Sequence, residues 1–183
     1  YSFYGINDFI ICCGYKGYVI KEYFANYFKH HSDITFHMKE NNKMVVHKKR
    51  AEPWTVTLID TGDESMTGGR LKRVASYLEE EENFCFTYGD GISDIDISKS
   101  IKFHKSHGKY ATVTAVLPES RFGILLTDNT NKVTSFQEKP KRSEGRINAG
   151  FFVLEPEVLD FIAGDNTMFE SESLSKIASE GQL

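Results

Sequence analysis

A carboxylate set between two glycines is the first feature of this chain that could do chemistry. The stretch FTYGDGISDIDI ends an apolar strand pattern at Gly89, Asp90 and Gly91, and Asp94 and Asp96 follow. Magnesium commonly binds one or two carboxylates plus substrate phosphates, so a lone aspartate at a strand end suits it. A tight turn in which Asp90 only bonds its own backbone fits the spacing equally well. The spacing does not match a calcium loop, so Asp94 and Asp96 are expected to be solvated or to cap the next helix.

Two further segments place polar groups just after strand patterns. In SMTGGRLKR, Ser65 and exposed amides around the Gly68-Gly69 pair precede a helix that Arg70 opens, and such amides suit a nucleotide or another anion. In FQEKP, Glu138 can accept from sugar hydroxyls and Lys139 can offer a cation to a phosphate. The alternatives are a solvated basic surface for the first segment and an exposed pair before a proline for the second.

Composition excludes several classes of protein. The 183 residues suit one domain, or most of a larger one, and a net charge of −4 gives no general attraction to nucleic acid or anionic lipid. No apolar run reaches membrane length. The three cysteines lie inside apolar, strand-like runs without zinc spacing, and buried free thiols in a reducing cytoplasm explain them best. We therefore expect neither a nucleic-acid nor a membrane partner.

The histidines and possible nucleophiles carry little signal. His104 and His107 share one side of an expected helix, but no carboxylate or cysteine completes a metal set, so an exposed helix surface is expected. Serine, cysteine and histidine show neither a nucleophile elbow nor a triad order. Acyl transfer finds no support.

The elements that position these residues follow from hydrophobic periodicity. Alternating strands and helices in the first half predict an α/β fold with a mostly parallel sheet covered by helices on both faces, and hairpins in the second half make the sheet mixed. The strand that ends at Asp90 should be central. Ser65, Asp90, Glu138 and Lys139 should share one rim of the sheet. Strands are expected within residues 8–15, 33–38, 44–49, 54–62, 83–90, 110–118, 123–128, 132–140 and 147–155. Helices are expected to begin near residue 17 and at residue 69, and to span 96–108, 156–163 and about 173–179. In the helix over 96–108, Ser98 is the expected N-cap and Gly108 the expected stop.

Taken in order, these segments resemble the sugar-phosphate nucleotidyltransferases. The resemblance rests on DFIICCGYKGYVIKEYF, EPWTVTLIDTGDESMTGGRLKRV, FTYGDGISDIDI, FHKSHGKYATVTAV, SFQEKPK and INAGFFVLEPEV. It implies a Rossmann-like mixed sheet and a magnesium-dependent reaction in which CTP and α-D-glucose 1-phosphate give CDP-glucose and pyrophosphate. It also implies that the product feeds dideoxysugar synthesis for O-antigen and lipopolysaccharide, and that the complete protein is a homo-oligomer.

The resemblance also implies roles for single residues. Asp90 matches the family's magnesium ligand and catalytic aspartate. The nucleotide side is implied to comprise Ser65, Gly69, Arg70 and Gly89, and the sugar-phosphate side Gly123, Glu138, Lys139, Asn148 and Gly150.

The chain departs from the family pattern at both ends. Family members begin with a strand, a G-G-x-G-T-R-L loop and a Lys-Pro segment, and a second magnesium aspartate lies beyond the part matched here. We therefore expect residues 1–183 to be one nucleotidyltransferase domain, incomplete at both ends and inactive alone. A UTP- or dTTP-dependent relative and a non-catalytic binding or assembly remnant remain alternatives.

Overall fold

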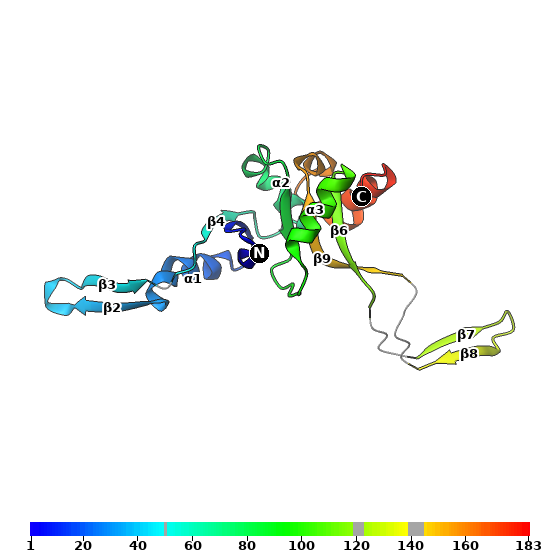
Figure 1. Ribbon diagram of the computed structural model, residues 1–183, viewed down its shortest axis with the longest axis horizontal. Helices are drawn as coiled ribbons and strands as arrows, with labels where there is room; N and C mark the ends of the chain where they lie inside the picture. The colour runs from blue at the N-terminus through cyan, green and yellow to red at the C-terminus, as the bar shows by residue number, and fades with distance from the viewer. Residues whose placement is uncertain (50, 119–122, 139–144) are drawn as a thin grey trace. The chain divides into compact units, whose positions relative to one another are not determined.

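The chain divides into two compact units in the computed structural model, which describes residues 1–49, 51–118, 123–138 and 145–183 (Figure 1). Unit 1 comprises Tyr1–Glu82 and Pro156–Gly181, and unit 2 comprises Asn83–Glu155 and Gln182–Leu183. None of the helices in the described ranges is long and apolar enough to cross a membrane. The expectation of one domain over 1–183 stays a prediction.

Unit 1 begins with an α/β arrangement. Strand β1 (Asp8–Cys13) pairs in parallel with β4 (Thr55–Asp60), and Cys13 lies opposite Asp60 at their carboxyl ends. Helix α1 (Gly17–His30) follows β1 and places Tyr27 against Trp54, with ring centroids 5.7 Å apart. The antiparallel hairpin of β2 (Ser32–His37) and β3 (Lys43–Lys49) lies between α1 and β4 in the chain.

The remainder of unit 1 is helical. Helix α2 (Thr67–Arg73) and a 3-10 turn (Ala75–Tyr77) belong with a C-terminal segment made of a 3-10 helix (Pro156–Phe161), a π-helical turn (Phe169–Ser173) and α4 (Leu174–Ser179). The buried apolar side chains of this region include Leu71, Val74, Phe169 and Ile177. The helix expected from Gly69 thus begins two residues earlier and ends after seven residues.

Unit 2 is built on an antiparallel sheet of three strands. Strand β9 (Ile147–Leu154) lies between β5 (Phe84–Thr87) and β6 (Ala111–Val116), and α3 (Ile97–His107) connects β5 to β6. A separate antiparallel hairpin joins β7 (Ile124–Thr127) to β8 (Val133–Gln137). Figure 1 shows β6 and β9 side by side, and the core of this sheet holds Ala111, Phe152 and Leu154.

The expectation of a mostly parallel sheet with a central β5 is not met. Among the strand pairs of the described residues, β1–β4 is parallel and the others are antiparallel. Strand β5 pairs there with β9 alone. The β5–α3–β6 crossover does make β5 and β6 run in the same direction, as a helix connection should. However, β9 enters between them in the opposite direction, and the alternation of strands and helices cannot reveal such an insertion.

Helix α3 ends as expected but begins differently. Gly108 takes the left-handed conformation (φ 62°) that commonly terminates a helix. The N-cap is Asp96, whose Oδ1 accepts from the Lys99 amide at 3.0 Å, and not Ser98. That hydrogen bond lowers the pKa of Asp96. Asp96 therefore serves the helix, one of the two roles expected for it.

Candidate active site

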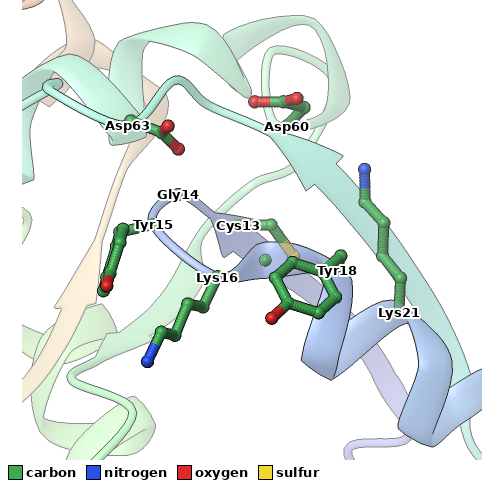
Figure 2. A pocket seen from close by; sticks show the side chains of 9 residues that line it. Cys13, Gly14, Tyr15, Lys16, Tyr18, Lys21, Asp60 and Asp63 are labelled. Carbon is green, nitrogen blue, oxygen red and sulfur yellow. The ribbon is translucent and has the colours of Figure 1, made fainter.

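The described part of unit 1 has a pocket at the carboxyl ends of its two parallel strands. Its volume is about 490 Å³, which lies within the usual range for small-molecule sites. In Figure 2, Asp60 and Asp63 lie on one side, and Tyr15 and Lys16 of the loop after β1 lie on the other with Tyr18 of α1. In an open α/β sheet, ligands bind outside the carboxyl ends of the strands. The pocket therefore stands where the fold favours a ligand.

The pocket carries charges of both signs. Lys16 and Lys21 line it together with Asp60 and Asp63, and Asp60 Oδ1 accepts from the Gly62 amide at 2.9 Å. Such a mixture suits a ligand that has both an anionic group and hydroxyl donors. Burial raises the pKa of the Cys13 thiol, so this lining residue is not an activated nucleophile.

The pocket residues Tyr15, Lys16, Tyr18 and Lys21 were missed by the sequence analysis. They lie in and just after Gly-Tyr-Lys-Gly at the end of the first strand, whereas the residues predicted from the sequence follow the later strands. The rule that ligands gather at strand ends would have found them if it had been applied to every strand.

Arg70 is held rigidly at the edge of this pocket. Its Nη1 donates to Thr61 Oγ1 at 3.0 Å and its Nη2 donates to the Asp63 carbonyl at 3.1 Å. The guanidinium lies so close to Gly14 that a Cβ there would overlap it. Thr61 is itself buried and donates to the Cys13 carbonyl. Arg70 thereby connects the loops that follow β1 and β4.

The expectation of exposed amides at the Gly-Gly pair is wrong for Gly68. Gly68 and Gly69 are both buried, and the Gly68 amide donates to the Thr167 carbonyl at 3.0 Å. A Cβ on Gly69 would overlap the backbone of Asp165. The two glycines therefore let α2 pack closely against residues 165–167. The nucleotide role of Gly69 stays a prediction.

Ser65 differs from the glycines because its hydroxyl remains available. The residue is half-buried, and no described group bonds its Oγ. The loop around it is anchored at the next residue, where the Met66 amide donates to the Asp165 carbonyl at 2.8 Å, and Asp165 in turn makes a bidentate pair with Arg73 at 2.8 and 2.6 Å. This pair lowers the pKa of Asp165. Ser65 thus presents a free hydroxyl on a fixed loop.

In unit 2, Asp90 lies on a β-turn that directly follows β5. The Gly91 amide donates to the Tyr88 carbonyl at 3.2 Å, so Gly89 and Asp90 are the two central residues of the turn. Both are exposed. Within the described residues nothing bonds the Asp90 carboxylate, so the turn closes without it. The alternative in which Asp90 bonds its own backbone is therefore wrong.

The Asp90 carboxylate fits a magnesium ion that is completed by substrate phosphates. The described residues hold no group of three or more histidine, cysteine, aspartate or glutamate side chains able to form a closed metal site. Magnesium needs only one or two carboxylates when phosphates and water supply the other ligands. The metal role of Asp90 nonetheless stays a prediction.

Strand β9 carries a bulge beside the end of β5. Val113 pairs with Phe152 but Ala115 pairs with Asn148, so β9 has two more residues than β6 over this stretch. Gly150 adopts φ 78°, and a Cβ there would meet the Tyr88 ring at 2.7 Å. The Gly150 amide donates to Asn148 Oδ1 at 2.8 Å. The structure thus brings Asn148 and Gly150 to the strand end that carries Gly89 and Asp90.

The base of the β7–β8 hairpin joins two other expected residues. Ile124 pairs with Gln137, which sets Gly123 opposite Glu138. A Cβ at Gly123 would stand 3.0 Å from Glu138 Oε2, so the missing side chain makes room for this exposed carboxylate. Lys139 lies outside the described residues. The shared rim expected for Ser65, Asp90, Glu138 and Lys139 stays a prediction.

Comparison with known proteins identifies the family. The family model described as "Nucleotidyl transferase" matches residues 5–181. Glucose-1-phosphate cytidylyltransferase of Salmonella typhimurium (strain LT2) is 63% identical over 183 residues, which are 100% of this chain and 70% of that protein. The probable glucose-1-phosphate cytidylyltransferase of Bacillus subtilis (strain 168) is 39% identical over 184 residues, again 100% of this chain and 70% of that protein.

A solved structure agrees at the level of the fold. HddC from Yersinia pseudotuberculosis matches with a TM-score of 0.60 and 24% identity, over 96% of this chain and 68% of that one. The sequence segments that resemble the family, the candidate residues at strand ends and these comparisons all indicate the same family. The chain has the α/β nucleotidyltransferase fold and belongs to the nucleotidyl transferase family of enzymes.

Proposed function

We propose that this chain acts in the transfer of a cytidylyl group from CTP to α-D-glucose 1-phosphate, giving CDP-glucose and pyrophosphate. The observation that carries the proposal is the 63% identity with a glucose-1-phosphate cytidylyltransferase over the whole chain. The Asp90 carboxylate at a strand end, which none of the described residues bonds, supports it, because metal-assisted phosphoryl chemistry needs such a ligand.

The proposed reaction is an in-line displacement. A phosphate oxygen of glucose 1-phosphate forms a bond to the α-phosphorus of CTP, and the bond from that phosphorus to the oxygen bridging the β-phosphate breaks. Pyrophosphate leaves with that electron pair. Two anions must be brought together, so positioning and fixed positive groups contribute more than covalent chemistry. Asp90 would hold a magnesium ion, which would offset the negative charge of the phosphates.

On the nucleotide side, Ser65 offers a hydroxyl that no group in the described ranges bonds, and Arg70 offers a guanidinium that hydrogen bonds to Thr61 and Asp63 already hold in place. A donor that is fixed before binding costs little reorganisation when it meets a ligand. We assign both to the cytidine end of CTP, and we also assign Gly69 and Gly89 to the nucleotide.

On the sugar side, Glu138 is an exposed acceptor for glucose hydroxyls, and Gly123 keeps the space beside it open. Asn148 Oδ1 already accepts from Gly150, so the side-chain amide of Asn148 faces a ligand mainly as a donor. We assign Lys139 to the phosphate of glucose 1-phosphate. We also propose that the product supplies the synthesis of dideoxysugars for surface polysaccharide. The complete protein is proposed to be a homo-oligomer in the cytoplasm.

A chimera gives the test. In it, residues 1–183 replace the matching segment of the Salmonella typhimurium protein, so that the segments outside the match are present. Pyrophosphate release is then measured with glucose 1-phosphate, magnesium and CTP, UTP or dTTP in turn. We expect CTP to be the preferred nucleotide. Preference for UTP or dTTP would support the related transferases, and a folded but inactive chimera would support a non-catalytic remnant.

A further inference from the structure

The two strands that carry the metal side and the sugar side of the proposed site meet at one residue, Gly150. Its amide donates to Asn148 Oδ1 at 2.8 Å, and its carbonyl accepts from Thr87 Oγ1 at 3.0 Å. Both backbone polar groups of Gly150 are therefore held by side chains. One of these side chains belongs to β9 itself and the other is the last residue of β5.

The contact with Thr87 lies three residues before Asp90. Thr87 pairs with Phe151 in the β5–β9 register, and the turn of Tyr88–Gly91 begins directly after it. The Tyr88 ring rests on Gly150, where a Cβ would stand 2.7 Å from the ring. The start of the Asp90 turn is thus fixed against the bulge by one hydrogen bond and one ring contact.

The bulge needs this support because the ladder is interrupted there. Two extra residues of β9 face β6 between the Val113 and Ala115 pairings, so the β6–β9 ladder is irregular over this stretch. The Thr87 hydroxyl of β5 bonds the partly buried carbonyl of Gly150 within this stretch, and removing a hydrogen bond to a buried carbonyl is costly.

We infer that Thr87 is a positioning residue that couples the magnesium ligand Asp90 to the sugar-side residue Asn148 through the carbonyl of Gly150. This inference rests on the proposed function, since it takes Asp90 as the metal ligand and Asn148 as a sugar contact. Thr87 itself touches neither substrate nor metal. Its hydroxyl fixes the spacing between the two groups that do.

The test is a graded series at position 87 in the chimera. Thr87→Ser keeps the hydroxyl, Thr87→Cys keeps a weaker donor, and Thr87→Val keeps the shape without a donor. One hydrogen bond corresponds to an effect of about two- to tenfold. We expect Thr87→Val to weaken Mn²⁺ binding, measured by electron paramagnetic resonance in the presence of CTP, and to raise the KM for glucose 1-phosphate by that factor. Thr87→Cys should fall between Thr87→Val and Thr87→Ser, and Thr87→Ser should match the parent.

Two controls separate the possible failures. Ser173→Ala removes another hydroxyl that bonds a backbone carbonyl at 3.0 Å, but in unit 1, and should lower stability without changing Mn²⁺ binding. Asp90→Asn should weaken Mn²⁺ binding more than any change at Thr87. Suppose that Asp90→Asn weakens Mn²⁺ binding as expected. If Thr87→Val then matches the parent, or if Thr87→Ser is as impaired as Thr87→Val, the coupling is wrong and the proposed function stands. If Asp90→Asn leaves Mn²⁺ binding unchanged, both are overturned.

Discussion

The protein should lose stability in mildly acidic solution because of one buried histidine, His104. Its side chain is 1% exposed, and its Nδ1 lies 2.9 Å from Thr112 Oγ1. His107 Nε2 lies 2.7 Å from the same oxygen, and the Lys109 amide donates to His107 Nδ1. His107 therefore carries its proton on Nε2 and donates to Thr112. The Thr112 hydroxyl keeps one hydrogen of its own, which it can donate to His104 Nδ1 when that nitrogen is unprotonated.

The sign of the effect follows from the pKa of His104. Burial lowers that pKa below its ordinary value of 6.5, and the neighbouring His107 and Lys105 lower it further. Glu155 Oε1, 3.9 Å from His104 Nε2, favours the charged form, but burial prevails. Between the lowered pKa and 6.5 the unfolded chain binds a proton that the folded protein does not bind. The free energy of unfolding should therefore fall as the pH falls through this window, by at most about 1.4 kcal/mol per pH unit.

The assay is urea unfolding followed by circular dichroism between about pH 5 and about pH 8, where histidine titrates. His104→Asn keeps an oxygen near the Nδ1 position that can accept from Thr112 but cannot titrate. We expect this variant to be less stable at neutral pH, because it leaves a cavity, and to show a shallower pH dependence than the parent. His30→Gln, at an exposed position near the end of α1, should keep the parental slope. Equal slopes for His104→Asn and the parent would refute the argument.

Three further outcomes are expected. Arg70→Ala in the chimera should weaken CTP binding by about 1–3 kcal/mol and should weaken glucose 1-phosphate binding less. Glu138→Ala should weaken glucose 1-phosphate binding more than CTP binding. Isothermal titration of both ligands checks this, and equal losses for the two ligands would contradict the assignment. Gly69→Ala should lower the free energy of unfolding by about 1–3 kcal/mol, because its Cβ would overlap Asp165, and an unchanged urea midpoint would argue against this packing. Residues 1–183 expressed alone should release no measurable pyrophosphate, because the donors of the family's G-G-x-G-T-R-L loop and Lys-Pro segment are not among them. The loss of one preorganised donor costs about 100- to 1,000-fold in rate. Turnover near that of the chimera would contradict this expectation.

Local patterns in the sequence were sufficient to locate most elements. β1, α1 and the two hairpins lie where apolar periodicity and turn residues predict them. Gly108 ends α3 as expected, because few other residues adopt a left-handed conformation easily. These features depend on residues close in the chain, and that is why the sequence reveals them.

Features that depend on distant residues were not predictable in the same way. The insertion of β9 between β5 and β6 is decided by pairing partners more than 30 positions apart in the chain. Likewise, Gly68 and Gly69 read as an open loop, whereas contact with residues 165–167 buries them. His104 was expected on an exposed helix surface, and its burial against Thr112 corrects that interpretation.

The candidate site was predictable where chemistry and spacing coincide. Asp90 was left open between a metal ligand and a turn residue, and the hydrogen bond from the Gly91 amide to the Tyr88 carbonyl closes the turn without its carboxylate, which no described residue bonds. The roles of Asn148 and Gly150 came from family resemblance alone. Their mutual hydrogen bond, and the bond from Thr87, arise from a bulge that no local pattern announces.

The central claim is that Asp90 holds the metal for cytidylyl transfer, and one measurement tests it most directly. Pyrophosphate release from CTP and glucose 1-phosphate is followed over a magnesium titration for the chimera and for its Asp90→Asn variant, with thermal unfolding of both as the control for folding. Asparagine preserves the turn, whose closing bond runs from Gly91 to Tyr88, but removes the charge. We predict a higher magnesium requirement and lower turnover at an unchanged melting temperature. An unchanged magnesium requirement together with a lower melting temperature would contradict the account.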